Sequence, residues 1–162
     1  MSEQKICAIT GSNGYVGGCV KNYFASRAWE ILELTRSPKP SSRGIPFQLG
    51  AEISAAALAG VEVLVHCAYD FTPLTLTEIR AVNVAGTEKL FQAARAAGVK
   101  KIICISTISA FDGCKSLYGK AKLEIEKMHS TTARSSSVRV WFMAMIRAGC
   151  SANSRRKCKS YP

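Results

Sequence analysis

A tyrosine and a lysine four residues apart, Tyr118 and Lys122, are the pair of side chains in this sequence best suited to proton transfer. Side chains four positions apart lie on one face of a helix, so the ammonium would stand beside the phenol. A free phenol has a pKa of about 10, and a nearby cation favours its ionised form. A hydroxyl from the preceding turn, which offers Ser106, Thr107 and Ser109, would complete the set by binding the substrate oxygen. The alternative is a pair without chemistry on the protein surface.

A glycine-rich turn near the start of the chain has the spacing of a phosphate-binding loop. The apolar run at residues 5–10 leads into Gly11, Gly14 and Gly17. Gly11 would permit the tight turn, Gly14 the approach of backbone to a pyrophosphate, and Gly17 the packing of a helix on a strand. The simpler alternative is a turn that only connects two elements. The residues of this loop predicted to bind a cofactor are Gly11, Ser12, Asn13, Gly14, Tyr15, Val16 and Gly17.

Arg36 stands at the end of the expected second strand, residues 29–35. In dinucleotide-binding folds the residue roughly twenty positions after the glycine loop faces the adenosine ribose. An acid there binds the 2′-hydroxyl group, whereas an arginine accommodates a 2′-phosphate. Arg36 therefore predicts NADP as the preferred cofactor, with NAD as the alternative. The competing interpretation is a solvated charge, since Glu33 lies only three residues earlier.

Strand-like and helix-like segments alternate along the chain, which predicts an α/β fold with a doubly wound parallel sheet of the Rossmann type, in three α/β/α layers. Ligands bind such sheets beyond the carboxyl ends of the strands, where the glycine loop, Arg36, Ala68 and the 106–109 turn would meet. His66, at the end of one strand, is interpreted as a packed, hydrogen-bonded residue and not as a ligand or base. After the first strand, the expected strands are 29–35, 45–49, 61–68 and 101–106, and the expected helices are 15–27, 51–58, 77–97 and 117–128.

The composition predicts one cytoplasmic domain that binds no nucleic acid and no membrane. The 162 residues are 48% hydrophobic and include neither a secretory signal nor a bilayer-spanning run. The net charge of +11 is concentrated near the end, because seven of the 22 Lys and Arg residues and none of the acids lie from residue 134 onward. The seven cysteines lack paired spacing. We interpret them as small buried thiols, without a metal or a disulfide.

Taken together, the motifs resemble those of the short-chain dehydrogenase/reductase superfamily, in its extended branch of NAD-dependent epimerases and dehydratases. The resemblance implies an NADP- or NAD-dependent oxidoreductase or epimerase. Its partner would be a small hydroxyl or carbonyl substrate such as a nucleotide sugar, and the full-length form would be a homodimer. The alternatives are an inactive fragment that at most binds dinucleotide and an NADP-sensing binding module. The matching segments are 10–17, 65–68, 83–87, 106–107 and the pair Tyr118 and Lys122.

The resemblance also implies roles for individual residues. Tyr118 would be the catalytic acid/base, Lys122 its partner, which also holds the nicotinamide ribose, and Thr107 the hydroxyl that polarises the substrate. Counting into the preceding strand favours Thr107, and Ser106 and Ser109 remain alternatives. Cys67, Ala68 and Asn83 would lie on the cofactor side of the crevice.

The end of the sequence departs from this pattern. The family continues with a sixth strand reading like Arg-Pro-Gly-x-x-Tyr-Gly, whereas residues 134–162 are basic and without periodicity. Read from the third base of the Val140 codon, the codons for residues 140–146 must encode Leu, Met or Val, then Val, then Tyr or His, then Gly. The preceding residues permit Arg-Pro-Gly in that frame.

We therefore hypothesise a frameshift between about residues 128 and 137. The expected result is an incomplete Rossmann domain, 1–133, followed by a disordered, out-of-frame tail, 134–162. That fold would lack its last strand and its substrate region, and the 162-residue chain would be catalytically inactive. The alternative is a lineage-specific basic extension.

Overall fold

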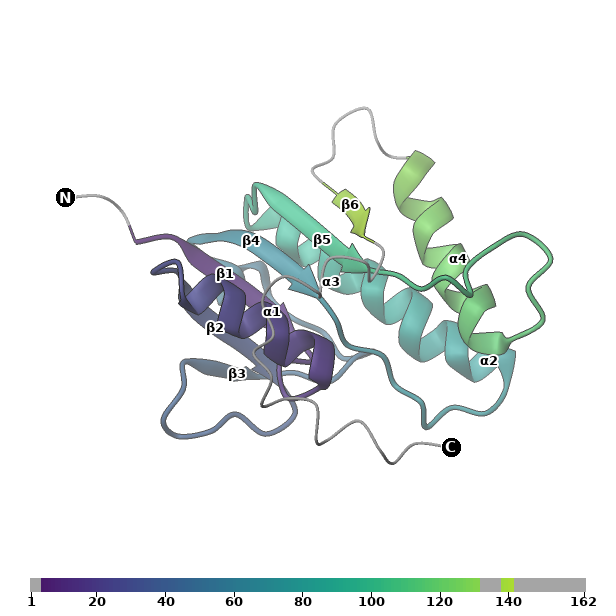
Figure 1. The fold of residues 1–162 in the computed structure, drawn as a ribbon, viewed down its shortest axis with the longest axis horizontal. Helices are drawn as coiled ribbons and strands as arrows, with labels where there is room; N and C mark the ends of the chain where they lie inside the picture. Colours follow the sequence, from purple (N-terminus) through teal and green to yellow (C-terminus); the bar gives the residue numbers. More distant parts are fainter. Residues whose placement is uncertain (1–3, 132–137, 142–162) are drawn as a thin grey trace.

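The fold is a parallel sheet wound with helices, and the computed structural model describes residues 4–131 and 138–141. Six strands lie in the order β3-β2-β1-β4-β5-β6, and every neighbouring pair is parallel (Figure 1). This order confirms the predicted doubly wound sheet of the Rossmann type. The strands are β1 (Ile6–Thr10), β2 (Glu30–Thr35), β3 (Gly44–Pro46), β4 (Val61–His66), β5 (Lys101–Ile105) and β6 (Val138–Trp141).

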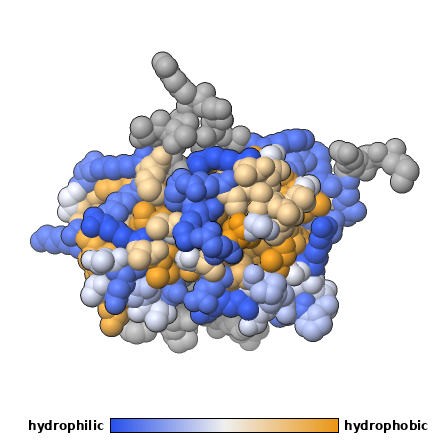
Figure 2. All heavy atoms as spheres, turned by 180° about the vertical axis from the view of Figure 1, so that it is seen from behind, coloured by the Kyte–Doolittle hydropathy of each residue, from blue (hydrophilic) through white to orange (hydrophobic). Residues whose placement is uncertain are grey.

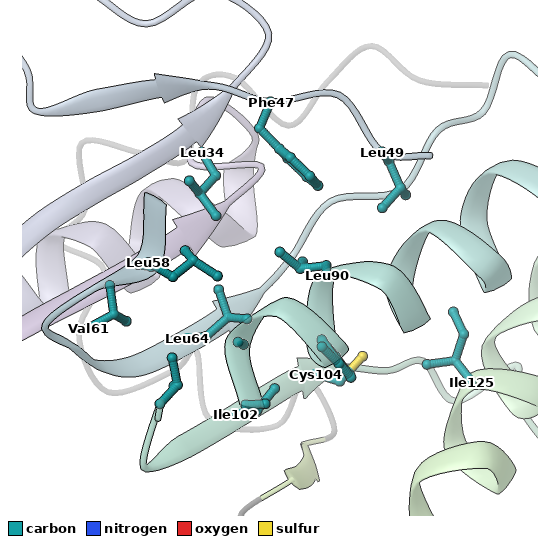
Figure 3. Close-up of a cluster of buried hydrophobic side chains, with 14 of the residues drawn as sticks. Leu34, Phe47, Leu49, Leu58, Val61, Leu64, Leu90, Ile102, Cys104 and Ile125 are labelled. Carbon is teal, nitrogen blue, oxygen red and sulfur yellow. The ribbon is translucent and has the colours of Figure 1, made fainter. Parts of the chain in front are cut away.

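Helices cover both faces of the sheet, because alternate residues of each central strand point to opposite sides. Cys7 and Ile9 of β1 pack with Val20 and Phe24 of helix α1 on one face. Ala8 of β1 belongs to the larger core on the other face, which also holds buried residues of the helices α3 and α4. Figure 3 shows that core from within. The helical elements are α1 (Tyr15–Ala25), η1 (Ala55–Leu58), α2 (Leu76–Ile79), η2 (Arg80–Val84), α3 (Ala85–Ala96) and α4 (Leu117–Thr131).

The long helix expected at residues 77–97 is a continuous helical run with a π turn, η2, between α2 and α3. It begins with a capping box, in which the Thr75 hydroxyl accepts from Glu78 N and the Glu78 carboxylate accepts from Thr75 N. It ends at Gly98, whose φ of 77° suits glycine. The π turn carries Asn83 into the protein interior. Such turns are frequent at functional sites.

The sixth strand corrects one part of the sequence prediction. We expected the last strand to be missing, but Val138–Trp141 pairs in parallel with Ile102–Ile105 of β5. The physical reason is that Val-Arg-Val-Trp is rich in β-branched and aromatic residues, which favour a strand, and β5 offers it an unpaired edge. The rest of the predicted tail, and most of the interval assigned to a frameshift, lies outside the described residues.

The surface combines charged and apolar side chains. On the face opposite to Figure 1, apolar side chains gather in patches that hydrophilic side chains separate (Figure 2). Within the described residues, no helix is long and apolar enough to cross a membrane.

Candidate active site

The glycine loop after β1 is shaped by two close backbone contacts. Gly11 has a φ of 69°, and a Cβ added to it would lie 3.0 Å from the backbone N of Ala68. A Cβ on Gly17 would lie only 2.1 Å from the backbone O of Gly11. These contacts confirm the tight turn at Gly11 and the close packing of helix on strand at Gly17. Gly14 is the N-cap of α1 and its N–H donates to Gly11 O at 3.0 Å, while its contact with a pyrophosphate stays a prediction.

The end of β4 is bound directly to this loop. The hydroxyl oxygen of Thr10 accepts hydrogen bonds from the backbone N–H groups of Cys67 and Ala68, both at 3.1 Å. Cys67 and Ala68 therefore lie beside Gly11, at the carboxyl ends of neighbouring strands. This is where the sequence placed one wall of the cofactor crevice.

The other residues of the loop differ in how much of the side chain reaches solvent. Asn13 and Tyr15 are exposed and Val16 is half-buried, so their contact with a cofactor stays a prediction. Ser12 is buried, and its Oγ donates to Glu33 Oε2 at 2.6 Å. The hydroxyl of Ser12 therefore faces β2, and a contact of this residue with a cofactor phosphate stays a prediction.

Glu33 is a residue of this site that the sequence reasoning did not single out. Its carboxylate is buried and also accepts from Lys21 Nζ at 2.6 Å, so it joins α1, β2 and the glycine loop. Burial acts to raise the pKa of Glu33, but the hydrogen bonds and charge of Lys21 together with the Ser12 hydroxyl outweigh it and lower that pKa. An acid flanked by buried leucines in a central strand was the available signal.

Arg36 and Asp70 lie at the carboxyl ends of β2 and β4. Arg36 is exposed just after β2. The pKa of Asp70 is lowered mainly by the hydrogen bond from Thr72 N, at 2.9 Å, and additionally by the charge of Arg36. Arg36 therefore stands within electrostatic reach of the segment after β4. The structure does not test its predicted role toward a 2′-phosphate.

Asn83 fixes that segment from the interior. Its Oδ1 accepts from Asp70 N at 2.7 Å, and its Nδ2 donates to Asp70 O at 2.9 Å. Both polar atoms of the buried Asn83 side chain are thus hydrogen-bonded to the backbone of Asp70. Asn83 thus fixes the position of the chain after β4, and the contact of its side chain with a cofactor stays a prediction.

The predicted catalytic side chains converge where β5 ends and α4 begins. The Thr107 side chain lies close enough to the Tyr118 phenol to act on its pKa, in the direction of lowering it. Ser106 is buried and its Oγ donates to Glu126, whereas Ser109 lies with its backbone carbonyl against Gly119. Among the three candidate hydroxyls, the structure therefore brings Thr107 to the phenol. This agrees with the position that the resemblance implied.

Lys122 is the part of the catalytic set that differs from the expectation. Its side chain is only 3% exposed, its Nζ donates to Ile105 O at 2.9 Å, and it lies 5.6 Å from the centre of the Tyr69 ring. Burial lowers the pKa of Lys122, and burial raises the pKa of Tyr118 against the influence of the Thr107 side chain, which acts to lower it. The expected lowering of the phenol's pKa by the ammonium is therefore wrong for this structure, because desolvation dominates.

Two aromatic residues after β4 surround the phenol, and the sequence reasoning missed them. The Tyr69 ring meets the Tyr118 ring edge-on at 4.7 Å, and the Phe71 ring stacks on it at 5.7 Å. Phe71 is 72% exposed, so this contact lies at the protein surface. The available signal was an aromatic pair directly after a buried strand.

The interpretation of the cysteines as buried thiols holds for Cys7 and Cys104, whereas Cys67 is half-buried. Burial raises the pKa of Cys7 and of Cys67 to about 12, and Cys104 is also buried. Within residues 4–131 and 138–141, no cluster of three or more potential metal-binding side chains occurs.

A comparison with known proteins matches most of this chain to one protein family. The profile of the NAD dependent epimerase/dehydratase family matches residues 7–144. A UDP-glucose 4-epimerase from Vibrio cholerae is 32% identical over 165 residues, covering 84% of this chain and 49% of that protein. A 4-hydroxy-2-methyl-3-oxo-4-farnesyl-3,4-dihydroquinoline-1-oxide ketoreductase from Stigmatella aurantiaca is 27% identical over 135 residues, covering 78% and 39%.

The fold is found in solved structures as well. A short-chain dehydrogenase/reductase superfamily protein from Agrobacterium tumefaciens, crystallised with bound NAD, superposes with a TM-score of 0.70 at 24% identity. The alignment covers 85% of this chain and 48% of that one. The chain thus spans about half the length, or less, of the relatives it matches.

Proposed function

Since this chain belongs to the NAD dependent epimerase/dehydratase family, we propose that it provides the dinucleotide-binding and proton-transfer part of an NADP- or NAD-dependent oxidoreductase or epimerase. Its substrate would carry a hydroxyl or carbonyl group, as a nucleotide sugar does. The observation that carries the proposal is the contact of Thr107 with Tyr118 at the sheet edge where the glycine loop also lies. A module that only senses dinucleotide would not need that contact.

The proposed chemistry assigns one step to each side chain. When bound, the nicotinamide ring supplies or accepts a hydride at the reacting carbon. Tyr118 gives its phenolic proton to the oxygen of a carbonyl substrate, and takes a proton from the hydroxyl in the reverse direction. Thr107 hydrogen-bonds the same oxygen and stabilises the charge that develops on it. Because burial raises the pKa of Tyr118, the phenol is protonated at neutral pH, which supports the carbonyl-reducing direction.

Lys122 has a different task in this proposal. An ammonium has three N–H donors, and the structure uses one of them on the carbonyl of Ile105. We assign the remaining donors to the hydroxyl groups of the nicotinamide ribose. Lys122 would then join the end of β5 to the cofactor and would not need to approach the phenol.

The glycine loop and its surroundings fit a dinucleotide. The Gly11 and Gly17 contacts leave no space for a Cβ, so the loop is held tight against β4 and α1, as a phosphate cradle requires. α1 has no acid in its first turn that would repel a phosphate. We propose that Arg36 selects NADP, and the charge of Glu33 does not oppose it, because Lys21 neutralises that carboxylate.

The cofactor assignment is tested by titrating the 162-residue chain with NADPH and with NADH and following the reduced nicotinamide fluorescence. A charge-assisted contact is worth about 1.5–3 kcal/mol, so Arg36→Ala should weaken NADPH roughly ten- to a hundredfold and leave NADH nearly unchanged. Arg43→Ala is the matched control, because Arg43 belongs to the same loop but is paired with Glu30. Equal losses of both cofactors in Arg36→Ala would contradict NADP selection.

A further inference from the structure

His66 connects three elements of the fold from a fully buried position. It is the last residue of β4 and is 0% exposed, with its ring edge-on to Phe91 of α3 at 5.6 Å. Its Nδ1 lies 2.8 Å from the Thr10 hydroxyl of β1, and its Nε2 lies 3.1 Å from the Thr87 hydroxyl of α3. The packed, hydrogen-bonded interpretation of His66 is therefore confirmed, and its partners show what the packing achieves.

The direction of these hydrogen bonds follows from counting donors. Thr10 Oγ1 accepts from the backbone N–H groups of both Cys67 and Ala68, which occupies its two lone pairs. The Thr10 hydroxyl must therefore donate its proton to His66 Nδ1. A neutral imidazole with an accepting Nδ1 carries its proton on Nε2, which then donates to Thr87.

The chain of hydrogen bonds continues consistently at its far end. The Thr87 hydroxyl donates to the backbone O of Asn83 at 2.6 Å, so its oxygen is available to accept from His66 Nε2. Asn83 in turn holds Asp70 by two hydrogen bonds. The neutral imidazole of His66 thus links Thr10, which binds the backbone of Cys67 and Ala68, to Asn83, which binds the backbone of Asp70.

We propose that His66 is a positioning residue, protonated at Nε2, which orients the Thr10 hydroxyl and thereby holds the backbone amides of Cys67 and Ala68 against the glycine loop. The backbone of residues 67–68 packs closely on Gly11, since a Cβ on Gly11 would lie 3.0 Å from Ala68 N and 3.1 Å from Cys67 C. A displacement of the end of β4 would therefore open or close the wall of the cofactor crevice. As far as cofactor affinity is concerned, the inference rests on the proposed function.

The first test reads the tautomer directly. The chain has two histidines, and the ring nitrogens of His66 can be assigned by nitrogen-15 NMR of wild type against a His129→Gln variant. We expect a neutral ring at pH 7, protonated at Nε2 and bare at Nδ1. A ring protonated at Nδ1, or at both nitrogens, would overturn the directional chain.

The second test breaks this chain of hydrogen bonds, the His66 relay, at Thr87, the end away from the predicted cofactor crevice. Thr87→Val removes the acceptor of His66 Nε2, and Thr87→Ser restores a hydroxyl. In Thr87→Val we expect the amide hydrogens of Cys67 and Ala68 to exchange roughly three- to tenfold faster, and NADPH to bind more weakly by a similar factor, with recovery in Thr87→Ser. The matched control is Thr35→Val, because the buried Thr35 hydroxyl has no partner among the described residues. This control should change neither quantity.

The outcomes separate the inference from the proposed function. Unchanged exchange at Cys67 and Ala68 in Thr87→Val overturns the positioning role, whether or not NADPH binds. Faster exchange with unchanged NADPH affinity overturns the link to the crevice. If the wild-type chain binds no dinucleotide, the proposed function fails, and the tautomer and exchange measurements still decide the role of His66. An additive effect of Thr87→Val in a His66→Leu background would also contradict the relay.

Discussion

Replacing Gly17 by alanine should separate the packing role of the glycine loop from helix propensity. A Cβ at this position would lie 2.1 Å from Gly11 O, 2.7 Å from Gly11 C and 2.9 Å from Ser12 Cα. All three atoms belong to the backbone, so no side chain can rotate away. Because an ordinary contact is 3.4–4 Å, α1 would have to move away from the loop by more than an ångström.

The expected magnitude follows from two opposing terms. Alanine is favoured over glycine inside a helix by about 0.5–1 kcal/mol. Overpacking against a rigid neighbour costs about 1–3 kcal/mol, and more when the backbone must shift. We therefore expect Gly17→Ala to lower the free energy of unfolding by about 1–2 kcal/mol or more. The adjacent Gly18 is the control, because a Cβ there would meet only Ser12 O at 3.7 Å, and Gly18→Ala should raise that free energy by about 0.5–1 kcal/mol.

Urea unfolding followed by far-ultraviolet circular dichroism measures both variants under the same conditions. The opposite signs of the two neighbouring substitutions are the diagnostic result. The Gly17→Ala loop should also bind NADPH more weakly, since its turn is displaced. If Gly17→Ala and Gly18→Ala unfold at the same urea concentration, the close approach of α1 to Gly11 does not exist in solution.

Three further predictions concern side chains of the site. In a full-length version of the protein, Tyr118→Phe should abolish turnover and spare cofactor binding, since it deletes only the transferable proton; retained turnover would make the phenol structural. Thr107→Val should reduce kcat strongly, while Thr107→Ser retains most activity, and a loss of kcat in Ser106→Ala as large as that in Thr107→Val would reassign the hydroxyl. The lowered pKa of Glu33 means that its carboxylate stabilises the fold above its unfolded pKa of about 4.3, and this contribution is lost as the pH falls through its folded pKa. The difference in free energy of unfolding between wild type and Glu33→Gln should therefore shrink from pH 6 to about pH 3, and a difference that grows would contradict the assignment.

The sequence predicted the features that depend on local chemistry or on alternation. The glycine spacing predicted the turn at Gly11 and the close packing at Gly17, and alternating segments predicted the parallel sheet. Short elements were predicted less well. The helix expected at 51–58 is only a 3₁₀ turn, Ala55–Leu58, because Ser54 caps it late and Gly60, with a φ of 76°, follows soon after it.

The sequence could not predict which partner a buried charge selects. The four-residue spacing placed Lys122 near Tyr118, but the ammonium is bound by the carbonyl of Ile105, which belongs to another element. The same limit applies to Glu33, which is held by Ser12 and Lys21 from two other elements. Such partners are set by tertiary packing and by the cost of burying a charge without compensation.

The coding argument decides where the hypothesised frameshift must lie. In the shifted frame the codons before Val140 permit Arg-Pro-Gly, and the codons that follow give Val, then Tyr or His, then Gly. A frame that already includes the Arg-Pro-Gly codons must begin before them, so the shift is expected between about residues 128 and 137. The strand β6, Val138–Trp141, would then be translated from the altered frame, and its pairing with β5 would rest on the strand propensity of Val-Arg-Val-Trp. Resequencing the gene through this interval should reveal a one-base change, followed downstream by codons that continue the family in the shifted frame. An intact frame without such a continuation would leave residues 134–162 as a genuine basic extension of this chain.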